Sequence, residues 1–253
     1  MRIPGARSAG WILRASALAL ACAGLFACTA PVPSAPETGT SAAAETAALT
    51  ARYTELARAG EHILRLDPAG SSVRILAFRA GKAARLGHNH VLAAPRFVGF
   101  VQLPRAPGGT ASFDLLIRPD ELVLDEAPLR AELGPAFAGT LDAADIEATR
   151  AHMLGEEGLQ AGRYPQVRLH GLALRGEAPH CAVLAQVELH GQRRELWLPV
   201  TLQEASGHFQ AEGRFVLRQS DFGVTPYSVL GGALAVQDEV IVSFRLAGAA
   251  LAP

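Results

Sequence analysis

Histidines are the residues of this sequence with the clearest capacity for chemistry. His88 and His90 are separated by one residue, so on a β-strand both imidazole rings would project from the same face. Two imidazoles on one face are a common arrangement of metal ligands, and His152 is the third ligand that we can name. The same rings could instead bond the head group of a quinone or a phosphate. They could also bond backbone groups in a turn, with no functional role.

Other arrangements that would support catalysis are missing from the sequence. It contains no Gly-x-Ser-x-Gly elbow, no phosphate-binding loop and no His-Glu-x-x-His motif. His180 stands beside Cys181, but neighbouring residues of a strand point to opposite faces, so the two would form a poor base and nucleophile pair. We therefore expect a protein that is not an enzyme and has no catalytic residues.

The elements that must position these histidines are mostly β-strands. From His62 onward, apolar and polar residues alternate in clear segments, at 112–117, 183–190, 195–202, 208–217 and 239–246. Such alternation is typical of antiparallel sheet with one face in solvent. Turn-forming residues separate the runs and indicate hairpins; they lie at 67–70, 107–109, 176–179, 190–192 and 206–207.

Two stretches favour helix instead. Residues 42–60 have apolar residues at three- to four-residue spacing and end at a glycine, and residues 142–154 form a second candidate before Gly155. About eight strands with one apolar face each must stack or close, and a closed barrel removes exposed sheet edges. The pattern therefore predicts a mainly β fold, an eight-stranded antiparallel barrel with one or two helices.

The N-terminus has the composition of a targeting segment. Arginines precede an apolar run that is short for a membrane span, and residues 25–28 (Leu-Phe-Ala-Cys) resemble the lipobox of bacterial lipoproteins. We predict a signal peptide at 1–27, lipidation at Cys28, a disordered tether at 28–41 and the barrel domain at 61–249. Ordinary secretory cleavage, or an uncleaved anchor, is the alternative. The expected location is the periplasm, with anchoring to the outer membrane.

Composition and charge narrow the classes of partner. The 253 residues are 49% hydrophobic with a formal net charge of −1, and loss of the three leader arginines leaves 20 basic against 24 acidic residues. Nucleic acid is therefore an unsuitable partner. After removal of the leader and acylation of Cys28, Cys181 is the single free thiol, so no internal disulfide is expected.

Several pieces of the sequence resemble the YceI-like family of lipid- or polyisoprenoid-binding domains, from about Leu64 to Leu246. The matching pieces are Arg85-Leu86-Gly87-His88-Asn89-His90-Val91, Met153-Leu154 with the Tyr164-Pro165 strand entry, Leu189-His190-Gly191 with Leu198-Pro199-Val200, and Gln219-Ser220-Asp221-Phe222-Gly223-Val224. The resemblance implies an extended lipocalin-like barrel whose interior holds a long isoprenoid or acyl chain as the bound small molecule.

Residues on the apolar faces would then line the ligand's tunnel. The candidates are Phe113, Leu115, Val187, Leu198, Val200, Phe209, Phe215, Val242 and Phe244. Small residues such as Ala211 and Gly213 are mixed with these aromatics and favour an open channel, because an eight-stranded barrel has room for side chains or for one slender ligand. A barrel filled by its own side chains is the alternative.

Three functions remain open at this stage. The first is a periplasmic carrier for a polyisoprenoid, an isoprenoid quinone or a fatty amphiphile, with a homodimer as a candidate assembly. The second is a metal-binding role through His88 and His90, and the third is a structural module of the envelope with a solid barrel. A continuous internal void would disfavour the third.

Overall fold

The computed structural model describes residues 41–105, 111–205 and 207–252, and the structural statements below refer to these residues. The expected signal peptide, Cys28 and nearly all of the expected tether lie outside them. The chain forms mainly β-structure with three α-helices, α1 (Ala42–Arg58), α2 (Ala127–Glu132) and α3 (Ala143–Leu154). The sequence predicted α1 and α3; α2 was not anticipated.

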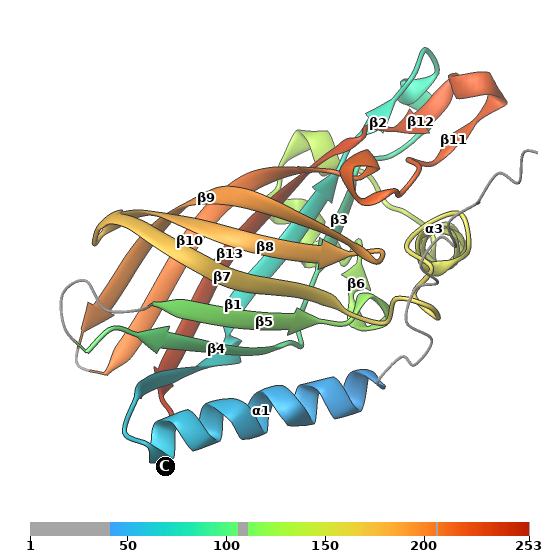
Figure 1. Ribbon diagram of the computed structural model, residues 1–253. Coiled ribbons are helices and arrows are strands. Elements are labelled where there is room, and N and C mark those ends of the chain that lie inside the picture. Colours follow the sequence, from blue (N-terminus) through green and yellow to red (C-terminus); the bar gives the residue numbers. More distant parts are fainter. Residues whose placement is uncertain (1–40, 106–110, 206, 253) are drawn as a thin grey trace, which may run out of the picture. The chain divides into compact units, whose positions relative to one another are not determined.

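Eight antiparallel strands close into a barrel (Figure 1). They are β1 (His62–Ala77), β4 (Val98–Leu103), β5 (Ser112–Ile117), β7 (Val167–Glu177), β8 (His180–Leu189), β9 (Gln192–Ala205), β10 (His208–Arg218) and β13 (Glu239–Ala250). Each strand pairs with the next, and pairing of β1 with β13 closes the ring, from Leu64 opposite Ala250 to Leu76 opposite Ile241. The predicted fold class is thus confirmed.

The long strand β1 corrects one detail of the sequence analysis. Residues 67–70, expected to form a turn between strands, lie inside β1 at a shift of register between Asp67 and Ser72. The Asp67 carboxylate accepts hydrogen bonds from the backbone N–H groups of Ala69 and Gly70. These residues therefore make a bulge, which lets one strand bend and pair first with β4 and later with β3.

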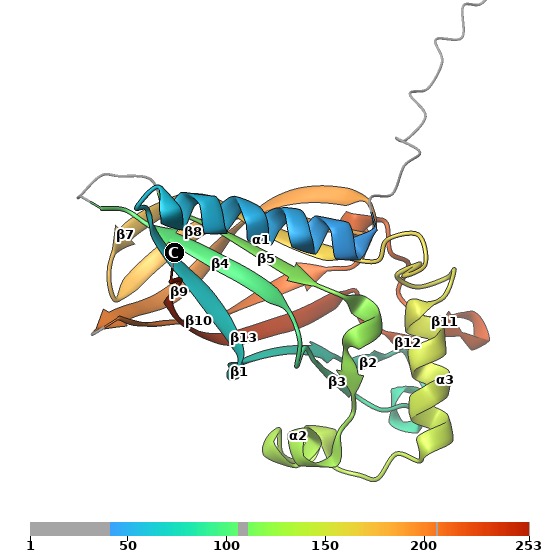
Figure 2. The same cartoon turned by 90° about the horizontal axis from the view of Figure 1, so that it is seen from below.

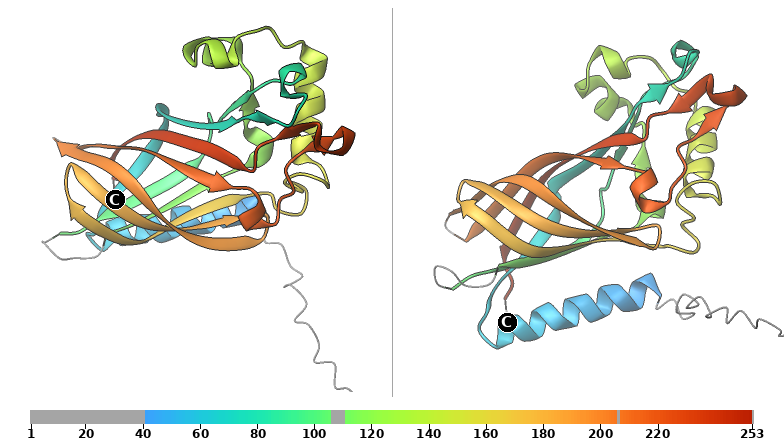
Figure 3. Two further views of the ribbon diagram at one scale, coloured as in Figure 1. Left: turned by 90° about the horizontal axis from the view of Figure 1, so that it is seen from above. Right: turned by 45° about the horizontal axis from the view of Figure 1, so that its top comes forward.

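Shorter elements gather at one end of the barrel, as Figures 1 and 3 show. They are β2 (Arg79–Ala80), β3 (His90–Ala93), β6 (Val123–Leu124), β11 (Ser228–Val229) and β12 (Leu234–Val236), with the 3-10 turns η1 (Ala84–Leu86), η2 (Pro119–Glu121), η3 (Pro135–Phe137), η4 (Ser220–Phe222) and η5 (Leu230–Gly232). Strands β11, β12 and β2 form a small separate sheet, while β3 and β6 extend the barrel wall. Helix α3 lies at the same end.

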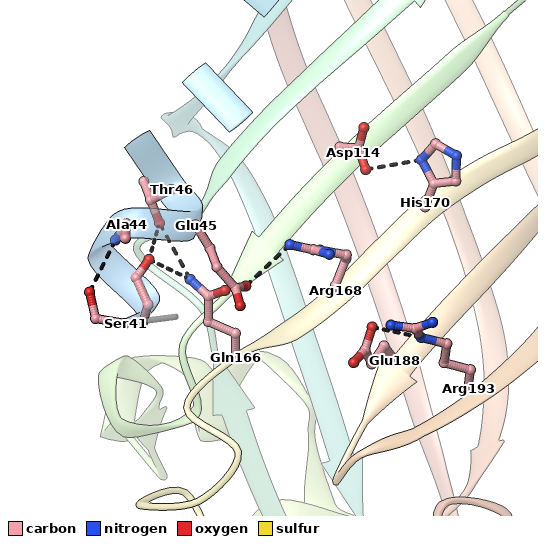
Figure 4. A network of polar contacts seen from close by, with 11 residues as sticks. Ser41, Ala44, Glu45, Thr46, Asp114, Gln166, Arg168, His170, Glu188 and Arg193 are labelled. Carbon is pink, nitrogen blue, oxygen red and sulfur yellow. Dashed lines mark hydrogen bonds and ion pairs between the residues drawn. The ribbon is translucent and has the colours of Figure 1, made fainter. Parts of the chain in front are cut away.

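Helix α1 lies along the outside of the barrel (Figure 2). It begins after Ser41, whose hydroxyl accepts a hydrogen bond from the Ala44 N–H. Its buried Tyr53 stacks on Phe100 of β4, with ring centroids 4.8 Å apart and planes 12° from parallel. Near the start of the helix, Glu45 forms an ion pair with Arg168 at 3.1 Å, as Figure 4 shows. The outer faces of β4 and β5 are therefore covered by protein and not by solvent.

None of the helices in the described residues is both long enough and apolar enough to span a membrane.

Candidate functional site

A cavity of about 760 Å³ runs through the barrel. Its size falls within the range of about 300–1,000 Å³ typical of small-molecule sites. All nine apolar residues that the sequence predicted to face a ligand line it: Phe113, Leu115, Val187, Leu198, Val200, Phe209, Phe215, Val242 and Phe244. Alternation along each strand is the reason, since every second side chain points inward. Their contact with a ligand stays a prediction.

Glycines in the wall help to keep this cavity open. A Cβ added to Gly171 of β7 would lie 2.4 Å from the Phe113 ring, so the ring rests where a side chain would otherwise be. Gly213 of β10 faces Phe244 in the same way: an added Cβ would lie 2.7 Å from that ring. Because the two phenyl rings lie against bare backbone, they occupy less of the lumen than they would over larger residues.

The two ends of the cavity differ in chemistry. Buried apolar residues line the end away from α3, including Leu66, Leu103 and Phe209. Polar side chains gather at the end near α3 and the small sheet, and they are Arg79, His88, His90, Asp145, Thr149, His152, Glu157, Gln219, Thr225 and Tyr227. Leu86 and His88 line this end and are also solvent-exposed, so the cavity reaches the surface there. We call this end the mouth.

The three histidines singled out by the sequence all line the mouth, but they occupy different elements. His90 is the first residue of β3, His88 precedes the strand in an irregular segment, and His152 lies in the last turn of α3. The expectation that His88 and His90 share a strand face is therefore wrong, because the strand begins only at His90. The described residues contain no group of three or more His, Cys, Asp or Glu placed to hold a metal ion.

His90 is held by a buried carboxylate. Its Nδ1 lies 2.6 Å from Oδ2 of Asp125, whose Oδ1 accepts hydrogen bonds from the Val91 N–H at 3.0 Å and from Arg130 at 2.6 Å. Arg130 also donates to the carbonyl oxygen of Asn89, while its Nε has no partner. The network fixes the backbone of residues 89–91 and the His90 ring at the mouth. Asp125 engages Nδ1 of His90, so Nε2 is the ring nitrogen that Asp125 does not engage.

The surroundings of Asp125 favour the ionised form of its carboxyl group. Burial of the carboxyl acts to raise its pKa, but hydrogen bonds from His90, the Val91 N–H and Arg130 outweigh burial, so the pKa of Asp125 lies below its usual value. Asp125 and Arg130 were not predicted from the sequence, because Asp125 stands 35 residues from His90 along the chain and only the fold brings them together.

His152 has a different environment. Its ring meets the Tyr227 ring edge to face, with centroids 4.3 Å apart, and its Nδ1 lies 4.0 Å from a carboxylate oxygen of the exposed Glu157. The contact joins α3 to the segment before β11, and it places an aromatic ring and an imidazole on the same wall of the mouth. These groups can stack on or hydrogen-bond to a planar or phosphorylated head group.

Cys181 does not belong to this site. It is a free, buried thiol on β8 that does not line the cavity, and burial raises its pKa. A thiol with a raised pKa is a poor nucleophile at neutral pH.

Comparison with known proteins gives a family and a structure of similar fold. No curated protein matches the chain. The crystal structure of BcnA from Burkholderia cenocepacia superposes with a TM-score of 0.53 at 18% identity, covering 72% of this chain and 98% of that one. The YCEI protein of Campylobacter jejuni gives a TM-score of 0.45 at 10% identity, covering 62% and 82%. The first likeness shows a shared fold. The family model of the YceI-like domain matches residues 65–247, most of the chain, and the chain therefore belongs to the YceI-like family.

Proposed function

We propose that this protein is a periplasmic carrier that holds one long apolar amphiphile, such as a polyisoprenoid, an isoprenoid quinone or a fatty amphiphile, inside the barrel. The tail lies among the phenylalanine and aliphatic side chains of the lumen, and the head group lies at the mouth near His88, His90 and His152. The observation that carries the proposal is the cavity of about 760 Å³ with an apolar body and polar groups gathered at one end.

Burial of the tail supplies enough affinity without ionic contacts. Each CH₂ group moved from water into the lumen contributes about 0.8 kcal/mol, so a dozen carbons contribute roughly 10 kcal/mol, comparable to the cost of association of about 4–15 kcal/mol, and a longer isoprenoid tail contributes more. The head-group contacts then fix which end of the ligand reaches solvent. A solid barrel acting only as a structural module is disfavoured by the cavity, and the described residues offer no metal cluster to support the metal-binding alternative.

The test of the carrier function is to identify what the purified protein holds. The full chain is purified from the membrane fraction in a mild detergent, extracted with organic solvent, and the extract is analysed by mass spectrometry. The expected result is one class of long-chain amphiphile at close to one molecule per protein. An empty extract, together with no binding of added isoprenoid quinone or fatty acid, would refute the proposal.

A pair of variants on one strand separates lumen binding from surface binding. Ala211 is buried and lines the cavity, so Ala211→Trp should fill part of the lumen and lower the ligand content by about ten-fold or more. Gln210 is its exposed neighbour on the same strand, and Gln210→Trp adds the same side chain outside. Equal ligand content in the two folded variants, judged by circular dichroism, would exclude the lumen as the site.

Lipid anchoring at Cys28 is part of the same proposal and has its own test. Cys28→Ser should abolish labelling with an alkynyl fatty acid, because the acyl chain is attached at the cysteine itself. Equal labelling of the parent protein and the Ser variant would contradict anchoring by this cysteine.

A further inference from the structure

The mouth carries a projecting lip formed by two segments, residues 79–88 and 225–236. Their strands β2, β11 and β12 pair as one small sheet, in which Ala235 stands opposite Ala80 and Val236 opposite Arg79. The Ala83 N–H donates to the Ala233 carbonyl at 2.7 Å, and this bond ties the tips of the two segments together. Figures 1 and 3 show the lip extending beyond the barrel wall.

The tip of the lip exposes two leucines to solvent. Leu230 is 77% exposed and Leu86 is 68% exposed, more than any other large apolar residue that the structure describes. Leu230 also has a φ of 53°, a left-handed conformation that residues with a side chain rarely adopt. The solvent-exposed apolar side chain is unfavourable in water, which is expected of a residue that functions in a less aqueous environment.

The charge of the lip has one sign. Its two segments contain Arg79, Lys82 and Arg85 and no aspartate or glutamate, although the chain as a whole is slightly acidic. Arg79 donates to the Gly87 carbonyl and so is held within the lip. Lys82 and Arg85 are exposed beside the leucines and can reach outward. Basic side chains next to exposed apolar ones are the composition that binds an anionic membrane surface.

We propose that the lip docks on the surface of an anionic lipid bilayer. Leu86 and Leu230 enter the boundary between head groups and acyl chains, while Lys82 and Arg85 contact lipid phosphates. Leu86 lines the mouth as well, so docking places the opening of the cavity at the membrane, where an apolar ligand can pass with little exposure to water. This surface is additional to the proposed carrier function and does not require the ligand to be known.

The acidic residues near the mouth set the orientation. Asp145 and Glu157 also line the cavity, but they belong to α3 and the turn that follows it. They are exposed and lie on the wall joined to the lip by the contact between His152 and Tyr227. Repulsion of these carboxylates by anionic lipids would keep α3 away from the bilayer and turn the tip of the lip toward it.

The experiment places a fluorescent probe on the lip itself, so that an N-terminal anchor does not affect the outcome. In full-length chains carrying Trp11→Phe and Trp197→Phe, so that no native tryptophan remains, Leu230→Trp reports on the lip. Val216→Trp is the matched control on the barrel side, where Val216 is 57% exposed. Vesicles contain phosphatidylglycerol and phosphatidylcholine in equal parts, with brominated acyl chains as quenchers. We expect a blue shift and quenching for Leu230→Trp and neither for Val216→Trp.

Charge and salt provide the second part of the test. Combined with Leu230→Trp, Lys82→Gln and Arg85→Gln should each raise by about five-fold the vesicle concentration needed for half-maximal quenching. Arg175→Gln, which removes an exposed cation elsewhere on the barrel, should not. Pure phosphatidylcholine vesicles or high salt should weaken binding of the parent protein. Equal quenching at positions 230 and 216, no quenching at all, or a blue shift that depends on protein concentration without vesicles would overturn the proposal; the last result would indicate contact with a second copy.

Discussion

The hydroxyl of Tyr53 donates a hydrogen bond to the carboxylate of Asp114 over 2.9 Å, joining helix α1 to the outer face of strand β5. Asp114 also accepts a hydrogen bond from Arg52 at 3.3 Å and lies 3.0 Å from Nδ1 of His170. Burial, followed by the nearby Asp114 charge, raises the pKa of Tyr53, so the phenol keeps its proton and remains a donor. The helix is thus bonded to the barrel through a buried carboxylate.

Removing the Tyr53 hydroxyl should weaken the attachment of helix α1 to the barrel. Tyr53→Phe keeps the stacking on Phe100 but leaves the buried Asp114 with one donor fewer, and we expect the free energy of unfolding to fall by about 1–3 kcal/mol. Urea denaturation measures the change. Tyr227→Phe is the control, because Tyr227 is 41% exposed, and equal losses in the two variants would contradict a specific role for the bond.

Acid should destabilise the fold through Asp125. Its pKa is lower in the folded than in the unfolded protein, so its contribution is present above the unfolded value of about 3.9 and is lost as pH falls through the folded value. The unfolding free energy of the parent protein should therefore decline below about pH 4. In Asp125→Asn this part of the slope should be missing, whereas the exposed Asp221→Asn should keep it. Parallel pH profiles for all three proteins would show that Asp125 does not contribute.

The packing of Phe113 on Gly171 predicts a specific rescue. Gly171→Ala forces the ring toward the lumen, which should cost about 1–3 kcal/mol of stability and reduce the cavity available to a ligand. Adding Phe113→Leu should restore part of the stability, so the two changes are not additive in a double-mutant cycle. Gly162→Ala serves as the control, since nothing lies within 4 Å of the added Cβ. Additive losses would contradict the contact.

The buried thiol of Cys181 should be protected in the folded protein. With Cys22 and Cys28 replaced by serine, we expect the reaction of Cys181 with a thiol reagent at pH 8 to be more than about ten-fold slower than in urea, because burial raises the thiol pKa and limits access. Gln210→Cys in the same background provides an exposed thiol for comparison. Similar rates for the two thiols would show that Cys181 is accessible.

Alternation predicted the lumen well because it depends on a local rule. Strand side chains alternate regardless of which strands become neighbours, so Phe113 and Val242 could be assigned to the inner face without knowledge of the topology. The same rule fails on the outer face: alternation over residues 112–117 puts Asp114 on the solvent-facing side, whereas α1 covers it. Tertiary packing decides which part of the outer surface a helix covers, and the alternation of residues along a strand carries no information about that packing.

The mouth was less predictable because its contacts join distant segments. His90 meets Asp125 only after β3 and the segment beyond β6 come together, and no spacing in the sequence relates the two residues. The prediction of a turn at residues 67–70 was wrong for another reason. Asp, Pro and Gly favour both turns and bulges, and which of the two forms depends on the strands that pair around them. Helix α2 has only six residues and offers little periodicity to detect.

The pairing of β1 with β13 also governs the order in which this chain can fold. The barrel cannot close until the last strand has been synthesised, so the apolar inner faces of the earlier strands stay uncovered for almost the whole of translation. Such a chain is prone to aggregate before the barrel closes. The yield of folded protein should therefore depend on chaperones that hold unfolded chains more than on the stability of the native fold.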